Sequence, residues 1–154
     1  TGFAAMAPRK KLFNKAFFEK HFPEELKAGK IDLKTGYPDT GSGKYAHACT
    51  HEQWLEINNA QRAHLNFLEV FAPLAFFYLI GALNYPRVVV ILQLINIVGR
   101  FLYQTMYTAK GPQGRLAGAL LNLAALLGAF LTAIASALAL FGGVEGVIAF
   151  IIGN

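Results

Sequence analysis

Seven polar side chains lie within or next to the apolar stretches of this 154-residue chain, at spacings that could gather them into one site. They are Arg62, Asn66, Glu69, Arg100, Tyr103, Tyr107 and Arg115. The first three are spaced i, i+4 and i+7 and the next three i, i+3 and i+7, so each triplet occupies one face of a helix. Ionisable groups at membrane depth are costly, and each therefore needs a partner or a function.

These residue types suit a small zwitterionic ligand that carries several carboxylates. Arginine guanidinium groups bind carboxylates in a bidentate manner, and a carboxylate such as that of Glu69 binds an ammonium group. A purely structural alternative is equally consistent with the spacing. Arg62 and Glu69 would then neutralise each other, and the two tyrosines would mark the aromatic belt at the membrane interface.

The composition indicates that these residues belong to an integral membrane protein. Hydrophobic residues make up 55% of the chain and charged residues 15%, against about 25% charged residues in an ordinary soluble domain. Ten of the 14 Lys and Arg residues lie in residues 1–62, and none follows Arg115. This distribution excludes a soluble cytosolic domain and a nucleic-acid binder with a wide basic face. A single cysteine excludes an internal disulfide framework.

Three apolar runs predict an all-α membrane protein, an up–down bundle with three transmembrane helices. The first helix extends from Thr50 to about Leu83, and its apolar run is Phe67 to Leu83. The other two runs extend from Val88 to about Tyr107 and from Leu116 to Phe141. Each run is close to the roughly 20 residues that cross a bilayer. Thr50 and Gln53 predict a capping box at the start of the first helix. Loops are expected at residues 84–86 and 108–114. Small residues in the third run predict close helix packing, namely Ala117, Gly118, Ala124, Ala125, Gly128 and Ala129.

The distribution of charge predicts the topology of these spans. Residues 1–50 and the loop that contains Lys110 lie on one side, whereas Arg87 and the C-terminus lie on the other. At least twelve Lys and Arg residues then face the first side and one faces the second. By the positive-inside rule the first side is cytosol, matrix or stroma. The seven polar side chains gather within the leaflet on that side.

Residues 1–50 are predicted to form a polar, basic arm with a short amphipathic helix. Phe13, Phe17, Phe18 and Phe22 lie on one side of that helix, which ends near Pro23. The aromatic stripe could lie among lipid headgroups or pack on other protein, and the sequence leaves both open. Residues 51–141 form the transmembrane domain. Residues 142–154 form an apolar tail, too short to span the bilayer, that folds back or docks on a neighbour.

Other polar and aromatic residues give weaker indications. His47, Cys49 and His51 alternate in a segment that could be extended, but three such residues without a fourth make a poor metal site, so we expect no metal. Tyr45 and Trp54 are predicted to be interface anchors.

Two segments of the chain resemble the MAPEG family, the membrane-associated proteins in eicosanoid and glutathione metabolism. Residues 61–70 (QRAHLNFLEV) are similar to the glutathione-binding second helix of that family. Residues 99–107, followed by Pro112 and Arg115, are similar to the end of its third helix and the start of its fourth. The resemblance covers roughly residues 55–140. With the Tyr85-Pro86-Arg87 turn, it is strongest to the branch that contains microsomal glutathione transferase type three.

The resemblance implies a homotrimer that holds glutathione, its co-substrate, between neighbouring protomers near one face of an intracellular membrane. The membrane would be that of the endoplasmic reticulum, the mitochondrion or the plastid. The implied function is a glutathione transferase or peroxidase that attacks lipophilic electrophiles or lipid hydroperoxides reached from the bilayer. Arg115 would stabilise the glutathione thiolate. The glutathione-binding set would be Arg62, Asn66, Glu69, Arg100, Tyr103 and Tyr107.

The chain also departs from the family pattern. The family has a further helix before this one, whereas nothing in residues 1–50 could span a bilayer, so we expect that helix to be absent or truncated. Val70 stands where some members carry tyrosine. These departures favour an alternative of another class, a non-catalytic structural subunit of a larger respiratory or photosynthetic membrane complex. A lipid-binding partner without catalysis is a third interpretation.

Overall fold

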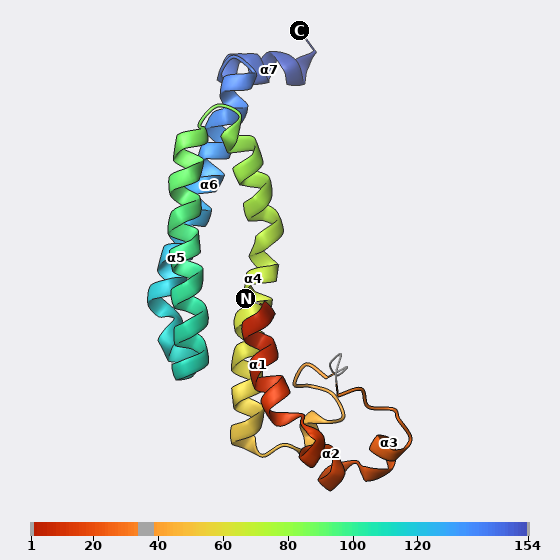
Figure 1. Cartoon of the computed structure of the whole chain (residues 1–154). Coiled ribbons are helices and arrows are strands. Elements are labelled where there is room, and N and C mark those ends of the chain that lie inside the picture. Colours follow the sequence, from red (N-terminus) through yellow and green to blue (C-terminus); the bar gives the residue numbers. More distant parts are fainter. Residues whose placement is uncertain (1, 34–38, 154) are drawn as a thin grey trace.

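Three long helices form the body of the molecule: α4 (His51–Ala82), α5 (Pro86–Lys110) and α6 (Leu116–Leu140). The structure is a computed structural model, and it describes residues 2–33 and 39–153. The three helices run up, down and up, with α5 and α6 as an antiparallel pair and α4 beside them (Figure 1). The described residues contain helices and turns and no strand, which confirms the predicted all-α fold.

The start of α4 confirms the predicted capping box. Thr50 Oγ1 accepts a hydrogen bond from the backbone N–H of Gln53 at 3.3 Å, and Gln53 Oε1 accepts one from the backbone N–H of Thr50 at 2.9 Å. With 32 residues, α4 is about 48 Å long. Its first turns therefore extend beyond the Lys110 end of α5 (Figure 1).

The connection between α5 and α6 is shorter than predicted. The prediction of a loop from residue 108 is wrong, because α5 continues to Lys110 and Gly111–Arg115 form the 3-10 helix η2. The Thr108 hydroxyl donates to the Gln104 carbonyl at 2.8 Å, a local bond that a helix tolerates. The helix ends at Gly111, whose φ of 67° favours glycine. This short connection keeps Arg115 close to the last turns of α5.

Small residues bring α5 and α6 into close contact. A Cβ atom on Gly118 would lie 2.3 Å from the backbone nitrogen of Tyr103, and Ala125 and Ala129 are fully buried. Close packing is therefore confirmed at these three positions, whereas Ala117 and Ala124 are exposed.

The surface of the three helices is that of an integral membrane protein. Within the described residues, two helical stretches are long and apolar enough to cross a membrane, His51–Ala82 and Pro86–Leu140. The second contains α5 and α6, which reverse direction at η2. Large apolar side chains lie exposed on every helix, as Leu79, Phe101 and Leu131 illustrate. An apolar surface of this extent needs lipid or protein around it.

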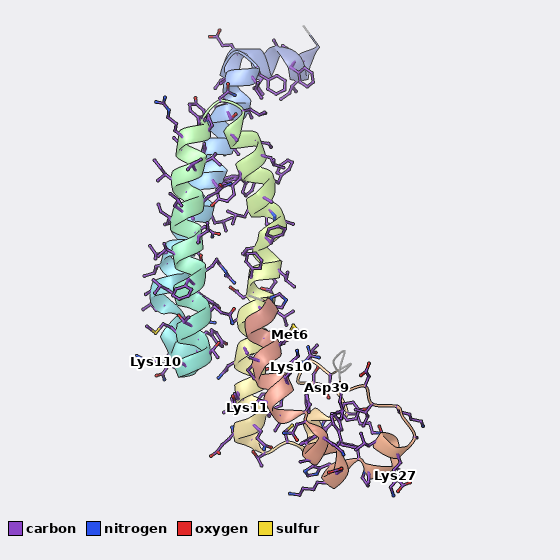
Figure 2. The ribbon with its side chains drawn as sticks, in the orientation of Figure 1. Met6, Lys10, Lys11, Lys27, Asp39 and Lys110 are labelled. Atoms are coloured by element: carbon purple, nitrogen blue, oxygen red, sulfur yellow. The ribbon has the colours of Figure 1, made fainter. Side chains whose placement is uncertain are left out.

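The basic arm contains more helix than predicted. It comprises α1 (Gly2–Leu12), α2 (Lys15–His21), α3 (Pro23–Lys27) and the 3-10 helix η1 (Ala46–Ala48). Helix α1, which contains Pro8, was not predicted from the sequence, and it packs beside the first half of α4 (Figure 1). Lys11 of α1 pairs with Glu56 of α4 at 3.0 Å. Figure 2 shows Lys10, Lys11 and Lys27 toward the same end of the molecule as Lys110, as the predicted topology requires.

The aromatic stripe of the arm packs on protein and not on lipid. Phe13, Phe17 and Phe18 are buried in a cluster with Ile31, Tyr45 and Ile57. The rings of Phe18 and Tyr45 meet edge to face, with centroids 5.1 Å apart. The sequence left open whether the stripe lies among lipid headgroups or packs on protein, and the structure shows the packing on protein. The arm has a small hydrophobic core of its own, to which Ile57 of α4 contributes.

The two predicted interface anchors, Tyr45 and Trp54, both hydrogen-bond to residues of the arm. The Tyr45 hydroxyl donates to Glu25 Oε2 at 3.2 Å, and the Trp54 Nε1–H donates to the carbonyl of Gly41 at 2.8 Å. The prediction for Tyr45 is wrong, because its ring is buried and its hydroxyl is bonded within the arm, whereas Trp54 is half-buried on α4 and stays a predicted anchor. Glu25 is also bonded to Lys44, and this bond is the main reason why the pKa of Glu25 is lowered.

Asp39 organises the loop that leads back to α4 (labelled in Figure 2). Its Oδ1 accepts hydrogen bonds from the backbone N–H groups of Gly41 and Gly43 at 2.8 and 3.0 Å, and its Oδ2 from that of Ala46 at 2.8 Å. Burial raises the pKa of Asp39, but these bonds together hold it below its ordinary value. The turn-rich sequence of residues 34–44 (KTGYPDTGSGK) predicts a loop, and its residues 34–38 lie outside the described residues.

The apolar tail forms a separate short helix, α7 (Val144–Ile152). It lies across the end of the bundle opposite the basic arm (Figure 1). Gly142 and Gly143, with φ values of 76° and 91°, make the turn between α6 and α7.

Candidate functional site

A polar cavity of about 330 Å³ lies between α4, α5 and the end of η2. Six of the seven predicted side chains line it, and Asn58 and Leu65 complete the wall. The six are Arg62, Asn66, Glu69, Tyr103, Tyr107 and Arg115. The structure therefore brings together residues that are separated by more than fifty positions in the chain.

Helix geometry explains how each element contributes to this cavity. On α4, Asn58, Arg62, Asn66 and Glu69 follow one face because residues spaced by three or four lie on the same side. On α5, Tyr103 and Tyr107 are one turn apart, and their ring centroids are 5.6 Å from each other. Both tyrosines are almost fully buried, with exposed fractions of 4% and 2%. The tyrosines thus form a buried wall, whereas α4 supplies Arg62 and Glu69 and η2 supplies Arg115.

The charged groups of the cavity are not used up by internal pairing. Within residues 2–33 and 39–153, no ion pair joins Arg62 to Glu69, and the salt bridges that form lie in the arm or between the arm and α4. Arg62, Glu69 and Arg115 are all exposed to the solvent. The alternative in which Arg62 and Glu69 neutralise each other is therefore not observed. Two cations and one carboxylate remain available to a ligand.

Arg100, the seventh predicted residue, does not line this cavity. Its Nη1 donates to Asn66 Oδ1 at 3.3 Å and its Nη2 donates to the carbonyl of Ala63 at 3.2 Å. Its guanidinium lies 5.0 Å from the ring centroids of both Phe67 and Tyr103. Arg100 is only 7% exposed and connects α5 to α4 directly behind the polar cavity.

Two further cavities continue from Arg100 into the apolar part of the bundle. One, of about 360 Å³, includes Asn96 and Asn122, whose side-chain amides hydrogen-bond at 3.2 Å between α5 and α6. The other, of about 650 Å³, is an apolar groove between α4 and α5 that contains Phe67, Phe71 and Leu79. Arg100 lines both of these cavities, and Asn66 lines both the first of them and the polar cavity.

Three asparagines of this region were not predicted as site residues from the sequence: Asn58, and the hydrogen-bonded pair Asn96 and Asn122. Asn58 stands four positions before Arg62, so the spacing that grouped the other α4 residues could have included it. Asn96 and Asn122 each interrupt an apolar run, and a polar amide at membrane depth requires a partner. Nothing in the spacing, however, identifies each as the partner of the other.

His47, Cys49 and His51 do not form an extended segment. His47 lies in η1 and His51 begins α4, because the capping box starts the helix there. The strand-like alternation is therefore wrong. In the part of the chain that the structure describes, no group of three His, Cys, Asp or Glu residues is placed to hold a metal ion.

The polar cavity combines features that suit an anionic or zwitterionic ligand with a thiol. Arg62 and Arg115 offer guanidinium groups to carboxylates or to a sulfur anion, Glu69 offers a carboxylate to an ammonium group, and the tyrosines offer hydroxyl donors. A family model described as MAPEG family matches residues 25–135, which include every residue of the cavity. No similar solved structure was found.

Proposed function

This chain belongs to the MAPEG family, and from that premise we propose that it is a membrane-bound glutathione transferase or peroxidase. The observation that carries the proposal is the polar cavity, where Arg62 and Glu69 of α4, the tyrosines of α5 and Arg115 meet without internal ion pairs. Glutathione has two carboxylates, one ammonium group and one thiol, and these groups match the charges of the cavity.

In this proposal the arginines and Glu69 bind the charged ends of glutathione and Arg115 acts on its sulfur. A thiol with a pKa of about 8.5 is mostly protonated at neutral pH, whereas the thiolate is the nucleophile. A guanidinium next to the sulfur favours the anion, and each pKa unit corresponds to about 1.4 kcal/mol. Arg100 contributes indirectly, because it holds Asn66 and packs on Tyr103.

The thiolate has two proposed reactions with lipophilic substrates from the bilayer. It forms a carbon–sulfur bond with an electrophilic carbon, either displacing a leaving group that departs as an anion or adding to an activated double bond whose carbanion then takes up a proton. Alternatively, it attacks the terminal oxygen of a hydroperoxide. In the second case the oxygen–oxygen bond breaks, the released alkoxide takes up a proton, and the sulfenic acid reacts with a second glutathione to give a disulfide and water. The apolar groove next to Arg100 supports a substrate that arrives from the membrane.

The test is thiolate formation on binding. Purified wild-type protein in detergent should show ultraviolet thiolate absorbance when glutathione is added, and Arg115→Ala should still bind glutathione by calorimetry but lose this absorbance. Lys110→Ala is the matched control, because this exposed cation lies near Arg115 in the chain and does not line the cavity. Normal thiolate absorbance in Arg115→Ala would contradict the assigned role. No glutathione binding to wild type would contradict the function itself.

A second candidate function is a non-catalytic subunit of a larger membrane complex of a mitochondrion or plastid. The arm favours this candidate, because it forms a small core of its own beside α4 and carries Lys10, Lys11 and Lys27 toward the Lys110 end of the bundle (Figure 2). Size in mild detergent distinguishes the two functions. A homotrimer with bound glutathione supports the enzyme, whereas co-purification with many other chains and no glutathione binding supports the subunit. The proposed orientation, with the arm in the cytosol, matrix or stroma, is shared by both.

A further inference from the structure

The helix α7 is apolar around almost its whole circumference. In its sequence, VEGVIAFII, only Glu145 and Gly146 are not apolar, and both lie in the first turn. Phe150 and Ile151 are more than 70% exposed, and none of the nine residues is buried. A helix that is hydrophobic on all sides is stable only when it is surrounded. Nine residues are too few to cross a bilayer, for which about 20 are needed.

Hydrogen bonds at the end of the bundle define the level at which α7 lies. Asn84, in the turn between α4 and α5, donates from Nδ2 to Ser136 Oγ at 2.8 Å. Ser136 Oγ in turn donates to the carbonyl of Ile80 at 2.7 Å. Ser136 is therefore level with the turn between α4 and α5, directly before the start of α5 that carries Arg87. The rest of α6 extends only about 7 Å beyond this level before Gly142 and Gly143 redirect the chain.

We propose that α7 lies in the plane of the lipid interface on the Arg87 side, with its apolar side chains among the acyl chains of that leaflet. Its surface is continuous with the exposed apolar surface of α6, which runs through Leu131, Ile134 and Leu140. Arg87, at the same end, is placed to meet lipid phosphate groups. Glu145 lies next to the glycine turn, where the chain enters the interface.

The distribution of side chains favours lipid over a protein groove as the surroundings of α7. A helix that docks in a groove has one apolar stripe and a polar opposite face. Interfacial helices with a strongly charged face lie at headgroup depth, about 5–10 Å into the boundary. Because α7 has no charged face, it lies on the acyl-chain side of the boundary between headgroups and acyl chains. The ring contact between Phe141 and Phe150, with centroids 5.2 Å apart, holds it against the end of α6.

Quenching by brominated lipids tests this position directly. Trp54 is the single tryptophan of the chain, so Phe150→Trp in a Trp54→Phe background gives one reporter on α7. The variant is placed in phosphatidylcholine nanodiscs whose acyl chains carry bromine either near the headgroup or near the chain end. Leu127→Trp in the same background is the control, because this exposed residue of α6 lies near the middle of the span. Circular dichroism verifies that both variants keep their helix content.

We expect bromine near the headgroup to reduce the emission of Phe150→Trp at least about twofold, and bromine near the chain end to reduce it less. The control should show the opposite order. Emission from Phe150→Trp that responds to neither lipid, while the control is quenched, would overturn the proposal. A blue-shifted maximum would then assign α7 to a protein partner and a red-shifted one to water. Neither result depends on glutathione, so the position of α7 is tested apart from the proposed function.

Discussion

Arg100 holds the two walls of the candidate site together without lining the polar cavity. It donates to Asn66 and to the Ala63 carbonyl of α4, and its guanidinium packs on the ring of Tyr103. We therefore predict that Arg100→Lys, which keeps the charge but loses the planar fork, weakens glutathione binding by about tenfold, or about 1.4 kcal/mol. Calorimetry with the purified protein measures this change.

A double-mutant cycle separates this indirect role from direct contact with the ligand. If Arg100 acts through Asn66, the losses caused by Arg100→Lys and Asn66→Ala should not add. The alternative, in which Arg100 binds a carboxylate of glutathione, gives a different result. The effect of Arg100→Lys would then shrink with a dipeptide analogue that lacks that carboxylate, and the positioning role would be wrong.

Asp39 is predicted to make the stability of the arm dependent on pH. Because its folded pKa is lowered, its contribution to stability is complete above the unfolded pKa and is lost as the pH falls through the folded value. Below about pH 4 the packing of the arm should therefore loosen. At neutral pH, Asp39→Asn should lower the free energy of unfolding of the arm by about 1–3 kcal/mol. The emission of Trp54, which is bonded to Gly41 in the same loop, reports the change. An arm that is equally stable at pH 3 and pH 7 would contradict the assignment.

At the scale of the helices, the contact between α5 and α6 rests on the absence of a side chain at Gly118. A Cβ there would meet the backbone of Tyr103 at 2.3 Å, and backbone cannot rotate away. We predict that Gly118→Ala lowers the stability by about 1–3 kcal/mol and weakens glutathione binding, because Tyr103 is displaced. Thermal unfolding in detergent, followed by circular dichroism, measures the first effect.

Gly128→Ala is the matched control for this prediction. Gly128 is also a helical glycine of α6. A Cβ atom added there would lie 2.6 Å from Cδ2 of Leu92, which is the flexible end of a side chain and not backbone. A small shift of that side chain accommodates the new methyl group, so the loss should be clearly smaller. If the two variants lose equal stability, the loss comes from helix propensity or general crowding. The close approach of Gly118 to the backbone of Tyr103 would then not be its cause.

The elements could be predicted where local chemistry determines them. The capping box at Thr50 and the periodicity of residues 62–69 depend only on neighbours in the sequence, and both are found in the structure. The end of α5 could not be predicted, because the turn residues from 108 onward allow either a loop or a further helical turn. The orientation of Arg100 and the interior position of Tyr45 depend on acceptors that only the folded chain brings near.

For the whole molecule, the main question is whether one chain or several build each site. Arg62, Tyr107 and Arg115 line one cavity within a single chain, although its charged groups are open to one side. A neighbouring copy in the proposed trimer would therefore close the cavity but would not supply its arginines. Co-expression of two differently tagged variants, Arg62→Ala and Arg115→Ala, tests this arrangement in the assembled protein.

We predict that mixed complexes of these two variants form no more glutathione thiolate than either variant alone, because every chain lacks one of its own arginines. Complexes that mix wild type with the Arg62→Ala/Arg115→Ala double variant serve as the control, and their thiolate absorbance should scale with the wild-type share. Recovery in the first mixture would place Arg62 of one chain and Arg115 of another at the same ligand. The site would then belong to the interface, and a lone chain would hold only half of it.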